Sequence, residues 1–197
     1  MTLSHRAGRS LKLTLWLIGV VLGVGLLSIF TYAGTLAATG NFHTVAAGEV
    51  YRAAQPSPAA ITEYQREHGV RTIINLRGAN RGAAWYDNEV ATARRLGIQH
   101  IDFKMSARRG ITKEEAWRLI QVMEQAPKPL LIHCESGADR TGLASALYLA
   151  AIKRTGEDIA ERQLSIRYGH IASPSAKGWG MTVTFEDMEP SLGYAES

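Results

Sequence analysis

The residues of this chain whose types and spacing suit chemistry lie between His133 and Gly142, in the stretch HCESGADRTG. Cys134 is the only cysteine of the chain, and Arg140 follows it after five intervening residues. A cysteine thiolate is a strong nucleophile, and an arginine presents a planar pair of N–H donors that fits two oxygens of a phosphate. The pair therefore predicts attack by the Cys134 sulfur on a phosphoryl group that Arg140 holds.

The segments on either side of this stretch must position it. Residues 130–133 form a short apolar run, and residues 143–152 form a longer, almost wholly apolar one. This pattern predicts a buried strand, a tight loop and a buried helix. The loop N–H groups and the positive end of the helix dipole then point at one place, which favours an anion there. We expect the phosphate to be bound by Glu135, Ser136, Gly137, Ala138, Asp139 and Arg140.

A covalent reaction follows from these parts. Cys134 would attack phosphorus, form a cysteinyl-phosphate and then release the phosphate to water. Gly137 permits backbone angles that let successive N–H groups converge on the anion. Thr141 would place its hydroxyl beside the sulfur and stabilise the thiolate as a leaving group. The six histidines are scattered and no pair has metal-ligand spacing, so we expect neither a metal nor another cofactor.

The chain around this loop alternates between strand and helix patterns. Strands are expected near 50–55, 70–76, 98–104 and 130–133, and helices near 58–68, 85–96, 112–125, 143–152 and 157–168. Such an alternation predicts an α/β fold with a mostly parallel central sheet flanked by helices. We place this domain at residues 49–172. Beyond Pro174 the pattern weakens, so residues 173–197 are interpreted as a C-terminal tail.

The N-terminal segment is hydrophobic. Residues 13–38 are apolar or small, and the run is long enough to cross a bilayer as one transmembrane helix. Positive side chains precede it within residues 1–12, and the next one after it is Arg52, so the positive-inside rule places the N-terminus in the cytoplasm. The sequence predicts a single-pass protein of the inner membrane, with a linker at residues 39–48 and the domain in the periplasm. A cleaved signal peptide is the alternative, and it would also export the domain.

Composition narrows the partners. The chain has 197 residues, which suffices for one domain and an appendage, and a modest net charge of +4. It has no basic run interleaved with aromatic residues, which argues against nucleic acid as a partner. A single cysteine cannot form an internal disulfide. The expected partners are a phosphorylated substrate and a membrane.

The motif His133-Cys134-x5-Arg140-Thr141-Gly142 resembles the signature of the cysteine-based protein tyrosine and dual-specificity phosphatases. The run VYRAAQP at residues 50–56 resembles the opening of the domain in small bacterial dual-specificity-like members, and TIINLR at residues 72–77 is similar to their second strand. The resemblance covers about residues 48–170. It implies a metal-free phosphomonoesterase of dual-specificity type, with Cys134 as nucleophile and Arg140 as phosphate binder.

The general acid has two candidates. The leaving oxygen needs a proton, which an aspartate on the loop after the preceding strand usually supplies in this family. In the corresponding stretch, 100–110, the only carboxylate is Asp102, which we place in the strand rather than on the loop. Asp139 lies inside the phosphate loop, where myotubularin-type lipid phosphatases also carry an aspartate. The sequence leaves Asp102 and Asp139 both open.

The substrate and the rival functions also stay open. Arg108 and Arg109 are expected on a loop at the rim of the site, as solvated charges or as attraction for an anionic surface. The substrate would be a protein carrying phosphotyrosine, phosphoserine or phosphothreonine, or a membrane-lipid phosphate. The alternatives are a catalytically silent phosphate-binding pseudophosphatase and a redox or sulfur-transfer protein. Cys134, Arg140 and Thr141 together argue against the first, and the absence of a second cysteine argues against the other.

Overall fold

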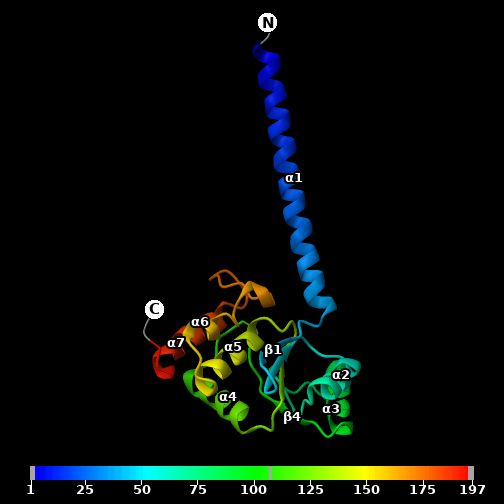
Figure 1. Cartoon of the computed structure of the whole chain (residues 1–197), viewed down its shortest axis with the longest axis vertical. Helices are drawn as coiled ribbons and strands as arrows, with labels where there is room; N and C mark the ends of the chain where they lie inside the picture. Colours follow the sequence, from blue (N-terminus) through cyan, green and yellow to red (C-terminus); the bar gives the residue numbers. More distant parts are fainter. Residues whose placement is uncertain (1–2, 107, 195–197) are drawn as a thin grey trace. The chain divides into compact units, whose positions relative to one another are not determined.

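The computed structural model describes residues 3–106 and 108–194, and the chain divides into two units, Met1–Ala38 and Thr39–Ser197. The first unit is a single helix, α1 (Leu3–Ala38) (Figure 1). Its segment Thr14–Ala38 has 25 residues and a mean hydropathy of 2.2, and none of it is buried in the protein. By length and composition this helix could span a membrane.

A five-stranded sheet forms the centre of the second unit, with the strand order β1-β2-β5-β3-β4. Neighbouring strands run parallel except for the antiparallel pair β1 and β2. The predicted α/β fold with a mostly parallel sheet is therefore confirmed. The strands are β1 (His43–Ala46), β2 (Val50–Ala53), β3 (Thr72–Asn75), β4 (Gln99–Asp102) and β5 (Leu130–His133).

Helices cover both faces of the sheet, with α2 and α3 on one side and α4 to α7 on the other (Figure 1). Side chains alternate between the faces along each strand, so Ile73 and Leu131 pack with α2 and α3, whereas Ile74 and Ile132 pack with α4, α5 and α7. The helical elements are α2 (Pro58–His68), α3 (Ala84–Arg95), α4 (Lys113–Gln125), α5 (Asp139–Leu147) continued by η1 (Tyr148–Ile152), α6 (Glu157–Glu161), η2 (Ile166–Tyr168) and α7 (Trp179–Leu192).

Two segments that the sequence pattern leaves outside the domain carry regular structure. Strand β1 lies within residues 39–48, and α7 lies within residues 173–197. Met181, Phe185 and Met188 of α7 are buried in the core on the side of α5. The described part of the second unit thus uses both segments to complete its sheet and its core.

Candidate active site

The residues that could do chemistry gather at one edge of the sheet. The four parallel strands are in register at their carboxyl ends, where Ala53 and Asn75 both pair with His133, and Asp102 pairs with Asn75. The loops that leave these strands therefore meet, as ligand-binding loops do in open parallel sheets. Because β5 is the central strand, the residue that follows it, Cys134, lies in the middle of this edge.

Residues 134–138, the cysteine loop, turn tightly from β5 into α5. Cys134 is buried, and its Sγ accepts a hydrogen bond from the N–H of Gly137 at 3.3 Å. Gly137 has a φ of 73°, and a Cβ there would come within 2.7 Å of the backbone of Ala53 and Ala54. The glycine predicted to shape this loop is therefore required both by its conformation and by the close approach of β2.

Arg140 stands at the start of α5 with its side chain 10 % exposed. Among the residues that the structure describes, its one charged partner is Glu135, whose side chain is exposed. Oε2 of Glu135 lies 4.0 Å from Nη2 of Arg140. A contact of that length and exposure holds an arginine weakly. The guanidinium is thus placed beside the cysteine loop with donors left for an anion.

Arg52, from the middle of β2, holds the cysteine loop from its buried side. Its Nη2 donates to the carbonyl oxygens of Gly137 at 2.8 Å and Ala138 at 3.3 Å, and its Nη1 donates to the carbonyl oxygen of Gln163 at 2.9 Å. The guanidinium also stacks 3.8 Å from the centre of the Tyr168 ring. Burial lowers the pKa of Arg52 to about 10, which leaves it charged at neutral pH. Two carbonyl oxygens of the loop therefore bind Arg52 on the buried side of the loop.

The sequence interpretation assigned no role to Arg52 in this site. One signal was available, since a charged residue in a strand buried at every position, Val50–Ala53, needs a specific set of partners. We expect Arg52→Met to lower the free energy of unfolding by about 3 kcal/mol, because buried carbonyls lose a charged donor. Chemical denaturation of the full chain in detergent measures this. Arg66→Met is the control, since Arg66 is exposed, and equal denaturation midpoints for the two variants would contradict the role of Arg52.

His133 fixes the other end of the loop. Its Nδ1 lies 3.3 Å from the carbonyl oxygen of Cys134, and its Nε2 lies 3.1 Å from Oε1 of Glu89 on α3. The same carboxylate oxygen meets His100 at 2.7 Å. Burial alone would raise the pKa of Glu89, but the hydrogen bonds from His100 and His133 outweigh it and lower the pKa to about 2. An ionised Glu89 therefore anchors the ring beside the nucleophile.

Asp102 ends β4, two strands away from β5, which corresponds to a lateral distance of roughly 10 Å. Its Oδ1 accepts from Asn75 Nδ2 at 2.8 Å, and its Oδ2 accepts from the Tyr86 hydroxyl at 2.6 Å. The hydrogen bond to Asp102, together with burial, raises the pKa of Tyr86 to about 12. Both oxygens of this carboxylate are thus engaged in fixing neighbouring side chains.

Asp139 begins α5, directly before Arg140. Its Oδ1 lies 2.8 Å from Nδ1 of His170, and its side chain is 26 % exposed. The ring of His170 is fully buried, and its Nε2 lies 2.9 Å from Oγ1 of Thr182 on α7. Gly178 packs against the same carboxylate. Sequence reasoning missed this support, because a lone histidine 31 residues away carries no local signal of it.

Thr141 is fully buried in the first turn of α5. Its Oγ1 has no hydrogen-bond partner among the residues that the structure describes, the Cys134 sulfur included. The expected contact between this hydroxyl and the sulfur therefore stays a prediction. A buried hydroxyl without a partner costs about 1–3 kcal/mol, which fits a group that bonds only when the site is loaded.

The loop expected to carry the acid packs against α7 instead. The N–H of Ile111 donates to Thr184 Oγ1 at 3.1 Å, and Gly110 meets Gly180 backbone to backbone. Arg108 and Arg109 are exposed, and their N–H groups donate to the Ser106 hydroxyl. Ala107 lies outside the described residues. This loop brings positive charge, and no carboxylate, to the edge of the sheet.

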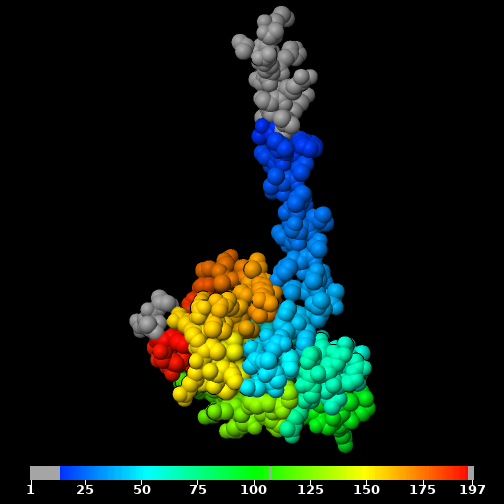
Figure 2. All heavy atoms as spheres, viewed as in Figure 1, coloured from blue at the N-terminus to red at the C-terminus, as the bar shows by residue number. Residues whose placement is uncertain are grey.

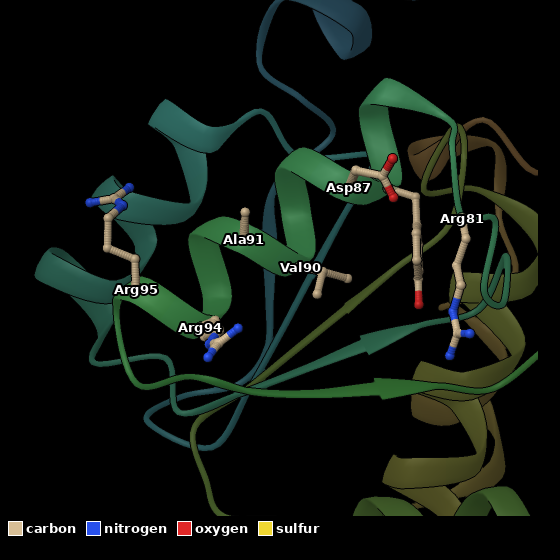
Figure 3. Close-up of a pocket in the computed structure, with 7 residues that line it drawn as sticks. Arg81, Asp87, Val90, Ala91, Arg94 and Arg95 are labelled. Atoms are coloured by element: carbon tan, nitrogen blue, oxygen red, sulfur yellow. The ribbon is translucent and has the colours of Figure 1, made fainter.

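A separate hollow of about 760 Å³ lies along α3 (Figure 3). Arg94 and Arg95 project from the end of the helix, and Arg81 reaches in from the preceding loop. Tyr86, whose hydroxyl binds Asp102, belongs to the lining, which otherwise consists of Arg81, Asp87, Val90, Ala91, Arg94 and Arg95. No residue of the cysteine loop lines this hollow, so it is distinct from the site around Cys134.

Several solved structures share the fold of this chain. TpbA of P. aeruginosa has 19% identity and a TM-score of 0.62, with 79% of this chain and 89% of TpbA covered. PTPMT1 has 15% identity and a TM-score of 0.58, with coverage of 77% and 98%. The catalytic core of the PP-IP phosphatase SIW14 from S. cerevisiae has 16% identity and a TM-score of 0.59, with coverage of 78% and 90%. At these identities the likeness shows the fold alone.

The family of this chain is identified by a match to its sequence. Among curated proteins no match is found. Residues 36–176, more than two thirds of the chain, match the model of the family described as DSP-PTPase phosphatase fused to NAD+ kinase. The match includes the whole cysteine loop and the strands around it. The resemblance seen in the motif is therefore confirmed, and the chain belongs to this family of cysteine-based, dual-specificity-type phosphatases.

Proposed function

We propose that this protein hydrolyses phosphomonoesters through a cysteinyl-phosphate, with Cys134 as nucleophile and Arg140 as the ligand of the phosphate. The observation that carries the proposal is the bond from the Gly137 N–H to the Cys134 sulfur. This bond supports the proposal, since a loop N–H that donates to the sulfur stabilises negative charge there. Glu135, Ser136, Ala138 and Asp139 would contribute the remaining loop contacts.

In the first step the Cys134 sulfur attacks phosphorus while the bond from phosphorus to the leaving oxygen breaks. The loop N–H groups and Arg140 hold the three other phosphate oxygens as charge moves onto them. In the second step a water oxygen attacks phosphorus, and the phosphorus–sulfur bond breaks to return the thiolate. Thr141 would stabilise that thiolate as it leaves. Inorganic phosphate is the second product.

We assign the general acid to Asp139. Both oxygens of Asp102 already accept hydrogen bonds, from Asn75 and Tyr86. Asp139 adjoins Arg140, and its Oδ2 has no hydrogen-bond partner in the described part of the chain. A protonated Asp139 would give its proton to the leaving oxygen, and the resulting carboxylate would take one from the attacking water.

We further propose that α1 anchors the protein in the inner membrane, with the N-terminus in the cytoplasm and the phosphatase domain in the periplasm. The apolar segment Thr14–Ala38 and the basic residues before it support this orientation. Asn41 follows α1 after two residues, and its side chain donates to the carbonyl oxygen of Ser136 in the cysteine loop. The phosphatase domain thus begins directly after the proposed anchor.

The substrate is proposed to be phosphate on a protein or on a membrane lipid. TpbA has been solved with pTyr and PTPMT1 with PI(5)P, so related folds accept both kinds of phosphate. The anchor and the exposed Arg108 and Arg109 favour the lipid, since cations concentrate at anionic surfaces.

The test is turnover by the purified full chain in detergent, without added metal. We expect release of phosphate from p-nitrophenyl phosphate that a chelator does not reduce, and saturable hydrolysis of a phospholipid bearing a terminal phosphate. Phosphotyrosine, phosphoserine and phosphothreonine peptides are the comparison. Efficient turnover of peptides with none of lipid would reverse the substrate assignment, and turnover of nothing, with phosphate still bound, would favour a silent binding module.

A further inference from the structure

The carboxylate of Asp139 is held by residues far from the cysteine loop. His170 lies between η2 and α7, and Thr182 lies in the first turns of α7. The His170 ring touches Asp139 through Nδ1, at 2.8 Å, and Thr182 through Nε2, at 2.9 Å. The ring is fully buried, and each of its nitrogens has one partner. Figure 2 shows the segment around residue 170, in orange, at the surface of the domain.

Hydrogen-bond chemistry limits how these three groups can be arranged. An ionised Asp139 only accepts, so the ring nitrogen that faces it, Nδ1, must carry the hydrogen. In a neutral ring the other nitrogen, Nε2, then accepts, and the hydroxyl of Thr182 is the group placed to donate to it. A hydroxyl can donate or accept, so Asp139 is the group that selects the tautomer of His170, and Thr182 holds the ring by donating to Nε2.

We propose that His170 is a positioning residue for the general acid and that Thr182 holds its ring in place. The inference rests on the proposed role of Asp139. With Oδ1 held by the Nδ1–H of His170, Oδ2 has no hydrogen-bond partner in the described part of the chain and is the oxygen that would carry the proton for the leaving group. When Oδ2 gives up its proton, the new carboxylate keeps the bond from Nδ1–H, which strengthens as the acceptor becomes charged. The water of the second step returns a proton to Oδ2, and His170 ends each turnover unchanged.

Gly178 completes the arrangement on the remaining side. A Cβ at this position would overlap Oδ1 and Cγ of Asp139. Its φ of −86° is one that alanine adopts freely, so the reason for a glycine here is space and not backbone strain. An alanine would therefore push the carboxylate away from His170 without removing any group that bonds.

The test compares phenyl phosphate, whose leaving group needs a proton, with p-nitrophenyl phosphate, whose leaving group needs little help. We expect His170→Ala to lower kcat on phenyl phosphate by roughly 10- to 100-fold, the worth of a hydrogen bond to a charged group, with a much smaller loss on p-nitrophenyl phosphate. KM is expected to stay unchanged, because the phosphate ligands are intact. His170→Asn should recover most of the loss, since its amide N–H lies close to the position of Nδ1–H.

Two further variants, each with a matched control, keep the test independent of folding. Thr182→Val should lower kcat on phenyl phosphate selectively, but by a smaller factor, roughly threefold to tenfold. Thr184→Val, the matched control on α7, should leave the ratio of the kcat values on the two substrates unchanged. Gly178→Ala should show the selectivity of His170→Ala, whereas Gly156→Ala, at a glycine outside the site with a compatible φ of −60°, should not.

Asp139→Asn separates this inference from the proposed function. If Asp139→Asn loses turnover selectively and His170→Ala and Gly178→Ala do not, the positioning role is wrong while Asp139 stays the acid. If Asp139→Asn shows no selectivity, the acid assignment fails and the role of His170 fails with it. If both are selective, the double variant Asp139→Asn with His170→Ala should lose no more than Asp139→Asn alone, because the two act through one carboxylate. Additive losses would overturn the inference.

Discussion

Cys134→Ser is expected to abolish turnover, with kcat falling by at least about 1000-fold. A serine hydroxyl stays protonated at neutral pH, and no described side-chain base lies within hydrogen-bond distance of the Sγ atom that it would replace. The substitution changes one atom, and the N–H of Gly137 can still donate to it. The loop should therefore keep its shape and go on binding phosphate after losing its nucleophile.

Two measurements check this expectation. Rapid quenching of the wild-type chain with substrate, followed by mass spectrometry, should place phosphate on the peptide that contains Cys134, and the serine variant should give no such peptide. Calorimetric titration with inorganic phosphate should show similar affinity for both. Arg140→Lys is the complementary variant, because a single ammonium cannot replace a planar fork and phosphate affinity should fall with turnover. If Cys134→Ser keeps more than about a tenth of the wild-type kcat, Cys134 is not the nucleophile.

The central part of the fold could be predicted because its signals are local. Residues 130–133 are apolar at almost every position, and a strand buried on both faces requires that pattern. The helix that starts after Thr112 has its capping box written in the sequence, and the structure forms both of its hydrogen bonds. The loop between β5 and α5 could be located from Cys134 and Arg140 alone.

The C-terminal helix shows what the local pattern hides. Met181, Phe185 and Met188 recur at helical spacing, so part of a signal for α7 was present. Gly178 directly before the helix, and Gly180 and Pro190 within it, weaken that signal. Strand β1 has only four residues and pairs with a neighbour on one side only. So short a segment gives almost no alternation of apolar and polar residues from which a strand could be predicted.

The sequence was sufficient to identify candidate residues of the site, but not the contacts that these residues make in the fold. Asp102 and Asp139 could both be found from composition, yet a choice between them depends on which of their oxygens are occupied. That depends on Asn75, Tyr86 and His170, which the fold brings from 27, 16 and 31 residues away. Arg52 meets Gly137 across 85 residues for the same reason. Such contacts depend on how distant strands, helices and loops pack together, which no single segment encodes.

Asp139→Asn is expected to lower kcat on phenyl phosphate by about 100- to 10,000-fold, the usual contribution of general acid catalysis, and to leave p-nitrophenyl phosphate nearly unaffected. Phenoxide is a poor leaving group unless it is protonated as the bond to phosphorus breaks, whereas p-nitrophenoxide leaves readily as an anion. An asparagine can still accept a hydrogen bond from His170, so the position of the side chain is preserved. Only the transferable proton is lost.

Asp102→Asn is the matched comparison, because it makes the same change from carboxylate to amide at the other candidate for the general acid. Both oxygens of Asp102 receive hydrogen bonds, so an amide nitrogen there would face the donor of Asn75 or of Tyr86. The expected result is a loss of stability of about 1–3 kcal/mol and an equal, modest loss on both substrates. Selective loss on phenyl phosphate in Asp102→Asn, and not in Asp139→Asn, would transfer the acid to β4. Selective loss in neither variant would remove the acid role from both aspartates and leave water or the substrate as the source of the proton.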